Sequence, residues 1–104
     1  MSAFTRPELP SLPDFYASIG EWTQALAPRL DYVEKALNGN NTDEMVDAQN
    51  VILEYVTKCP PGYDKLREVG QKIYAIDLAN TDQRIKDLQA NLDKYKAIGG
   101  QLAR

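Results

Sequence analysis

Residues 41–62, NTDEMVDAQNVILEYVTKCPPG, contain a helix start, an amphipathic helix and a helix stop. Asn41 is a residue type that caps backbone amides, and Glu44, three residues later, completes the pattern of a capping box. Pro60-Pro61-Gly62 removes two backbone donors, which ends a helix or bends it sharply. Between these signals apolar residues recur at three- and four-residue steps: Met45, Ala48, Val51, Ile52, Tyr55, Val56 and Cys59.

The segment before this helix has the same period. Asp14 after Pro13 is the predicted N-cap, and Asn38-Gly39 is predicted to close the helix. Pro28 lies inside it, which predicts either a kink near Leu26 or two short helices in series. The predicted buried stripe is Phe15, Ile19, Trp22, Leu26, Leu30, Val33 and Leu37.

A third helix is predicted from about Tyr63 to Ala79, with Leu66, Val69, Ile73 and Ile76 on its apolar face. Beyond it the stripe changes phase. Two series spaced by seven follow, one of Leu78, Ile85 and Leu92 and one of Leu88, Tyr95 and Leu102. Whether residues 62–98 form one helix or two stays open, but a break is favoured because Asn80-Thr81-Asp82-Gln83 repeats the start pattern at residue 41. The last helix is predicted from about Thr81 to Ile98, ending at Gly99-Gly100.

These elements predict an all-α fold, because no run of β-branched residues alternates with polar ones. The short connections at 38–41, 59–62 and near 80 place neighbouring helices antiparallel, giving an up-and-down bundle of three or four helices over residues 14–104. Residues 1–13, with Pro7, Pro10 and Pro13, are predicted to be an extended arm. Phe4, Leu9 and Leu12 could dock this arm on the bundle, but a solvated tail with occasional contacts is the favoured interpretation.

Composition excludes most chemistries. The 104 residues include 12 basic and 15 acidic side chains, a net charge of −3, one cysteine and no histidine. The commonest general base and transition-metal ligand are therefore missing, and a metal site, a cofactor or a small-molecule substrate is not expected. The basic residues are scattered, which argues against nucleic-acid binding. No apolar run is long enough for membrane insertion, and the absence of a disulfide framework favours a cytoplasmic location.

The acids of the first helix are predicted to be a solvated surface. Glu21, Asp31 and Glu34 are interspersed with Arg29 and Lys35, which is typical of the polar face of a bundle helix rather than of a catalytic carboxylate pair. We expect no enzymatic activity.

The tyrosines are the least ordinary feature of the sequence, because aromatic rings with a polar tip suit protein interfaces. Three of the six lie beside the main stripe of their helix. The candidate protein-interaction surface combines these three with the apolar residues that change phase near the last helix: Tyr16, Tyr32, Tyr74, Leu78, Ile85 and Leu92.

Three features of residues 15–104 carry a resemblance to a known family. They are Trp22 in the first helix, the motif Gly70-Gln71-Lys72-Ile73, and the segment with Arg84-Ile85, Leu88, Leu92 and Tyr95. They are similar to the aromatic residue of the first helix, a motif of the second helix and the third helix of a spectrin repeat, a three-helix module of cytoskeletal rods. The resemblance implies one long second helix from 42 to about 79, although Pro60-Pro61-Gly62 and Leu92, where the family usually has tryptophan, depart from the family pattern.

The expected function is therefore a non-catalytic structural or protein-interaction module, and the resemblance implies a spacer or docking element of a cytoskeletal-type scaffold. Protein partners are expected, and self-association is possible. The alternative is a small adaptor or export-type chaperone that holds an amphipathic helix of a client protein. Incomplete burial of the last helix's apolar stripe would favour this alternative.

Overall fold

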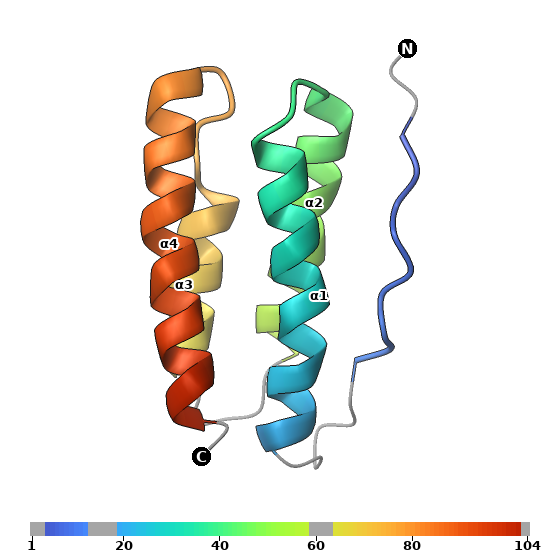
Figure 1. Ribbon diagram of the computed structural model, residues 1–104, viewed down its shortest axis with the longest axis vertical. Helices are drawn as coiled ribbons and strands as arrows, with labels where there is room; N and C mark the ends of the chain where they lie inside the picture. The colour runs from blue at the N-terminus through green and yellow to red at the C-terminus, as the bar shows by residue number, and fades with distance from the viewer. Residues whose placement is uncertain (1–3, 13–18, 59–63, 103–104) are drawn as a thin grey trace.

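The computed structural model describes residues 4–12, 19–58 and 64–102 (Figure 1). These residues contain four helices and no strand. The helices are α1 (Ile19–Leu37), α2 (Thr42–Thr57), α3 (Asp64–Tyr74) and α4 (Thr81–Leu102). The predicted all-α fold is confirmed, with four helices.

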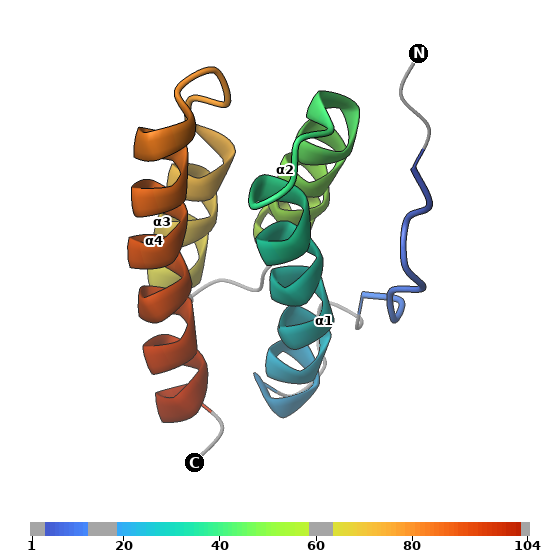
Figure 2. The same ribbon diagram turned by 45° about the horizontal axis from the view of Figure 1, so that its top comes forward.

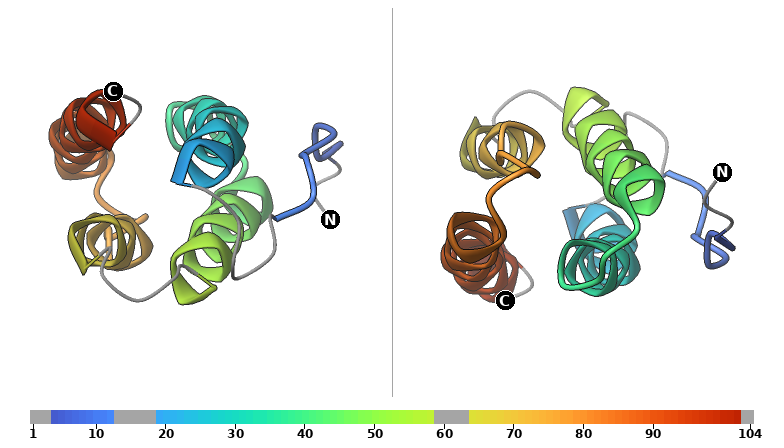
Figure 3. Two further views of the ribbon diagram at one scale, coloured as in Figure 1. Left: turned by 90° about the horizontal axis from the view of Figure 1, so that it is seen from below. Right: turned by 90° about the horizontal axis from the view of Figure 1, so that it is seen from above.

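Consecutive helices run in opposite directions, since the chain ascends α1, descends α2, ascends α3 and descends α4 in Figure 1. Seen along their axes, the helices occupy the corners of a square in the order α1, α2, α3, α4 (Figure 3). Each helix packs against its two neighbours around this square, because α1 also contacts α4. The described residues extend over 39 × 25 × 19 Å.

The resemblance to a spectrin repeat implies one helix where this structure has two. α2 ends at Thr57 and α3 begins at Asp64, and the two pack side by side in opposite directions. The signal to stop at Pro60-Pro61-Gly62 thus agrees with the helix bounds, although residues 59–63 themselves lie outside the described part. The relationship to spectrin repeats stays a prediction.

The core lies between the four helices and is built from the predicted stripes. Trp22 and Tyr55 pack against each other in this core, with ring centroids 5.2 Å apart and ring planes at 65°. This edge-to-face geometry is a favourable one for aromatic pairs. The other large side chains that are almost completely buried are Tyr32, Tyr95, Leu37, Ile52, Leu66, Ile73, Leu88, Leu92, Val33 and Val56.

Two helix starts form as the sequence predicts. The Asn41 side chain accepts a hydrogen bond from the Glu44 backbone N–H at 3.2 Å. Asn80 Oδ1 accepts from the Gln83 N–H at 3.1 Å. Each asparagine thereby satisfies a backbone donor that the first turn of a helix leaves without a partner. The break near residue 80 is confirmed.

Three helix boundaries differ from the predictions. α1 continues through Pro28 as one helix, so the prediction of two short helices in series is wrong. α4 continues through Gly99-Gly100 to Leu102, because glycine permits a helix end without imposing one. α3 ends at Tyr74, five residues before the predicted Ala79. The predicted N-cap of α1, Asp14, and the predicted core residue Phe15 lie outside the described residues.

The early end of α3 is stabilised by a buried glutamine of α2. Gln49 Nε2 donates to the backbone carbonyl oxygens of Ile73, at 3.1 Å, and Ile76, at 3.2 Å. These carbonyls lie at and just beyond the last turn of α3, where the regular pattern of helical donors ends. The Ile73 carbonyl oxygen also accepts from the Ile76 N–H at 3.2 Å, so the chain turns there with its carbonyls paired. Asp77 then accepts a hydrogen bond from the Ala79 N–H at 2.9 Å, which favours a turn rather than further helix.

Arg29 corrects the predicted polar face of α1. Its side chain is 6% exposed and donates to the carbonyl oxygens of Ala25, at 2.9 Å, and Pro10, at 2.7 Å. Burial lowers the pKa of the Arg29 guanidinium from its usual value. Arg29 is thus a structural link between α1 and the N-terminal arm, whereas Glu21, Asp31 and Lys35 are exposed as expected.

The N-terminal arm, residues 4–12, is docked on the bundle, and the favoured interpretation of a solvated tail is wrong for these residues. It runs beside α1 and α2 on the side away from α3 and α4 (Figures 2 and 3). Leu9 and Leu12 pack against the core. Arg6 forms two hydrogen bonds with the Asp47 carboxylate of α2, one of them from Nε at 2.9 Å. Apolar burial and these polar contacts together hold the arm.

Candidate functional site

The predicted interaction residues do not form one surface. Tyr74, at the end of α3, is 46% exposed, and Leu78 is half-buried against the core. Ile85, in the first turns of α4, is also half-buried. Tyr16 lies outside the described residues. The two other members, Tyr32 and Leu92, are buried.

Tyr32 is 2% exposed, so it cannot present its ring to a partner in this conformation. Its hydroxyl donates to Asp47 Oδ2 at 2.6 Å. Burial, with a further contribution from this hydrogen bond, raises the pKa of the Tyr32 phenol above its usual value. The sequence places Tyr32 beside the main stripe of α1, but Asp47 and the docked arm provide an enclosed polar site there.

Leu92 is completely buried, and its neighbours Leu88 and Tyr95 are at most 1% exposed. The apolar stripe of α4 is therefore used by the bundle itself. Tyr95 also places its hydroxyl 3.1 Å from the Leu66 carbonyl oxygen, to which it donates a hydrogen bond. Leu88, Leu92 and Tyr95 are therefore not available to a partner in this conformation.

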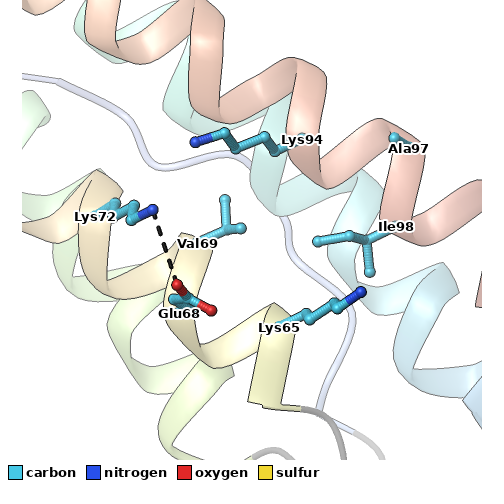
Figure 4. A pocket seen from close by; sticks show the side chains of 7 residues that line it. All are labelled: Lys65, Glu68, Val69, Lys72, Lys94, Ala97 and Ile98. Atoms are coloured by element: carbon cyan, nitrogen blue, oxygen red, sulfur yellow. Dashed lines mark ion pairs between the residues drawn. The ribbon is translucent and has the colours of Figure 1, made fainter.

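A shallow, open groove lies on the outer side of α3 and α4. It has a volume of about 380 Å³ and an apolar floor formed by Val69 of α3 with Ala97 and Ile98 of α4. Figure 4 shows Val69 and Ile98 projecting into the space between the two helices. Because Ala97 is small, α4 leaves part of this space unfilled.

Lysines surround the floor on both helices. Lys65 and Lys72 lie on the α3 side and Lys94 lies on the α4 side (Figure 4). Glu68 is the one acid that lines the groove, and its Oε1 is 3.9 Å from Lys72 Nζ. Neither Lys65 nor Lys94 forms an ion pair with any described residue. Three lysines and one glutamate give the groove a net charge of 3 − 1 = +2, in a chain of net charge −3.

Of the groove's floor, the sequence pattern assigns only Val69 to a core stripe. Val69 belongs to the predicted stripe of the third helix and Ile98 was predicted to end the last one. The lysines have the ordinary pattern of a solvated helix face, so nothing in the sequence marks them as neighbours. Their convergence depends on α3 and α4 packing antiparallel, which brings residues near 69 beside residues near 97.

A second cavity, of about 430 Å³, lies between the N-terminal arm and the bundle. Its lining includes Leu9 and Pro10 of the arm, Arg29 of α1 and Glu54 of α2. The arm already occupies most of this side of α1 and α2. This cavity is therefore a packing gap between the docked arm and the bundle.

No cluster of three or more histidine, cysteine, aspartate or glutamate side chains suited to a metal ion occurs in residues 4–12, 19–58 and 64–102. Within the same residues, no helix combines the length and hydropathy that a membrane crossing requires. Comparison with protein-family models, curated protein sequences and solved structures finds no match.

Proposed function

We propose that this chain is a non-catalytic protein-interaction module, and that the groove between α3 and α4 is its binding surface. The observation that supports the proposal is the apolar floor of Val69, Ala97 and Ile98 bordered by lysines on both helices. Such a surface combines an apolar centre with a polar rim, as protein interfaces commonly do. A cytoplasmic location, expected from the sequence, belongs to the same proposal.

The shape of the bundle favours a docking element over a long spacer. Its greatest dimension is 39 Å, and α2 and α3 fold back on each other instead of forming one long helix. A docking element of a scaffold needs one presented surface rather than length. We therefore keep the docking element of a cytoskeletal-type scaffold in the proposal and not the long spacer.

The alternative, an adaptor or export-type chaperone, retains one point in its favour, since a groove between two helices can accept a third helix. The form in which the last helix leaves its own stripe open is not favoured. Leu88, Leu92 and Tyr95 are buried in the chain alone.

A peptide selection that makes no assumption about the ligand tests the proposed surface. A displayed library of random 15-residue peptides is selected on the wild-type chain, and binders are then measured on two variants. Ala97→Trp fills the groove, and Gln89→Trp places the same side chain at an exposed position of α4 outside it. We expect binders that lose affinity for Ala97→Trp and keep it for Gln89→Trp. Recovery of no binder, or of binders indifferent to Ala97→Trp, would contradict the proposal.

A further inference from the structure

The N-terminal arm covers one long side of the bundle and not the opposite side. Residues 4–12 cover the outer side of α1 and α2, on the face opposite α3 and α4 (Figure 3). On the α3 and α4 side, no described segment lies over the groove. Val69 at its floor is buried in the core at 6% exposure, Ile98 is half-buried against the core, and Ala97 is exposed, so the open apolar surface of the groove comes mainly from Ala97 and Ile98 of α4.

We infer that the α3–α4 groove binds an acidic amphipathic helix of a partner protein. The inference rests on the proposed function and specifies the partner's chemistry. Two antiparallel helices form a groove into which the side-chain ridge of a third helix can pack. α3 has 11 residues, a length of about 16 Å, so a partner helix of three to four turns matches the site.

The charges decide which amphipathic helix fits. Lys65 and Lys94 have no ion pair with a described residue. Lys72 has one acidic partner, Glu68, at the long distance of 3.9 Å. Carboxylates that flank the apolar face of a partner would meet these lysines on both helices of the groove. A partner flanked by lysines or arginines would instead place like charges together, which disfavours binding and slows association.

The same lysines do not make a site for nucleic acid or an anionic membrane. They border an apolar floor instead of forming a continuous basic face, and the chain as a whole has a net charge of −3. Binding to phosphates requires a concentrated set of cations that displaces counterions. A protein helix with an apolar centre and acidic flanks matches both features of the groove at once.

Three displayed libraries of 15-residue peptides test the inference. All share apolar residues at three- and four-residue spacing, varied among Leu, Ile, Phe and Met, and they differ in their flanking positions, which are Glu, Lys or Gln. The libraries are selected on the wild-type chain and on Ala97→Trp. We expect enrichment of the Glu library on wild type and its loss on Ala97→Trp.

Charge reversal at the lysines of the rim provides a second test. The double variant Lys65→Glu, Lys94→Glu should weaken the selected acidic peptides about tenfold and shift enrichment to the Lys library. Lys86→Glu, Lys96→Glu is the matched control, because both lysines are exposed on α4, do not line the groove, and change the net charge equally. The control should change affinity less than about twofold.

The possible failures are distinguishable. Equal or stronger enrichment of the Lys or Gln library, sensitive to Ala97→Trp, would overturn the acidic partner and leave the proposed binding surface in place. Enrichment of no library would contradict both. A groove-dependent dimer in sedimentation, or binding to phosphatidylserine vesicles lost in Lys65→Glu, Lys94→Glu, would assign the groove to a second copy or to a membrane and overturn the inference.

Discussion

Gly70 on α3 lies directly against the hydroxyl of Tyr95 on α4, with no room between them for a β-carbon. An added β-carbon would also collide with Cγ1 of Val56 on α2. Val56 and Tyr95 are buried to within 1% exposure, and the Tyr95 hydroxyl is held by the Leu66 carbonyl oxygen. Three helices therefore approach one another closely at a position that requires glycine.

Gly70→Ala should destabilise the fold although alanine is the better helix former. The gain in helix propensity is about 1 kcal/mol, whereas overpacking a well-filled core costs about 1–3 kcal/mol. Because two buried side chains would have to move, we expect a net loss of up to about 2 kcal/mol in the free energy of unfolding. Urea denaturation followed by the fluorescence of Trp22 measures it.

Gln71→Ala is the control for this prediction, because Gln71 is the exposed neighbour of Gly70 in the same helix. A second test uses Val56→Ala in both backgrounds. If the collision is the cause, removal of the Val56 methyl groups costs less in Gly70→Ala than in wild type. An unchanged or increased stability of Gly70→Ala would show that α3 can move away without loss.

Leu88→Ala and Ile73→Ala should each lower the free energy of unfolding by about 2–5 kcal/mol. Both side chains are buried, at 1% and 0% exposure, so each truncation leaves a cavity between helices. Lys86→Ala, at an exposed position of α4, serves as the control. A urea midpoint shifted no further than that of the control would mean that the faces of α3 or α4 are wrongly assigned.

The sequence predicts the helices because apolar periodicity and cap residues are local signals. The stripes of α2 and the asparagine caps at residues 41 and 80 need no knowledge of distant contacts. Buried polar residues are different. Gln49 and Arg29 have the same residue types as solvated positions, and their burial depends on carbonyl groups of other elements. The sequence pattern therefore assigned Arg29 to the polar face.

The candidate site was predicted less well for the same reason. A tyrosine beside a helix stripe suits an interface or an enclosed site equally, and Tyr32 is enclosed because Asp47 of α2 accepts its hydrogen bond. The groove depends on where α3 and α4 lie relative to each other. Lys65 and Lys94 are separated by 29 positions along the chain, so no local pattern relates them.

Arg84→Lys should be strongly destabilising despite conserving the charge. The Arg84 guanidinium donates to the carbonyl oxygens of Leu37, at 2.9 Å, Leu78, at 3.0 Å, and Gly39, at 3.2 Å. It therefore joins the end of α1 to the connection before α4. A lysine ammonium lacks this planar set of donors, and carbonyls left without partners cost about 1–3 kcal/mol.

Arg67→Lys is the matched control for Arg84→Lys. Arg67 is a half-buried residue of α3 that pairs with Asp64 at 3.1 Å, and because the Asp64 carboxylate is 88% exposed this pair contributes little. We expect this control to change the free energy of unfolding by less than about 0.5 kcal/mol. Equal effects of the two substitutions, measured by urea denaturation, would contradict the role assigned to Arg84.

Acid should release the N-terminal arm by protonating Asp47. The hydrogen bonds from Arg6 lower the pKa of this carboxyl, burial opposes them, and the Tyr32 hydroxyl lowers it further. Because the pKa is lower in the folded chain than the unfolded value of about 3.9, the unfolded chain binds more protons in this range. The stability that Asp47 contributes is therefore complete above about pH 5 and falls as pH drops through the folded pKa.

Asp47→Asn should remove this part of the pH dependence and weaken arm docking at neutral pH, because an amide cannot pair with the Arg6 cation. We expect a loss of about 1 kcal/mol near pH 7 and a smaller difference from wild type at about pH 3. Urea midpoints across this range, with the amide resonance of Leu9 as the report on the arm, measure both effects. Asp31→Asn, at an exposed position of α1, is the control. A constant difference between wild type and Asp47→Asn at all pH values would show that the carboxylate charge does not hold the arm.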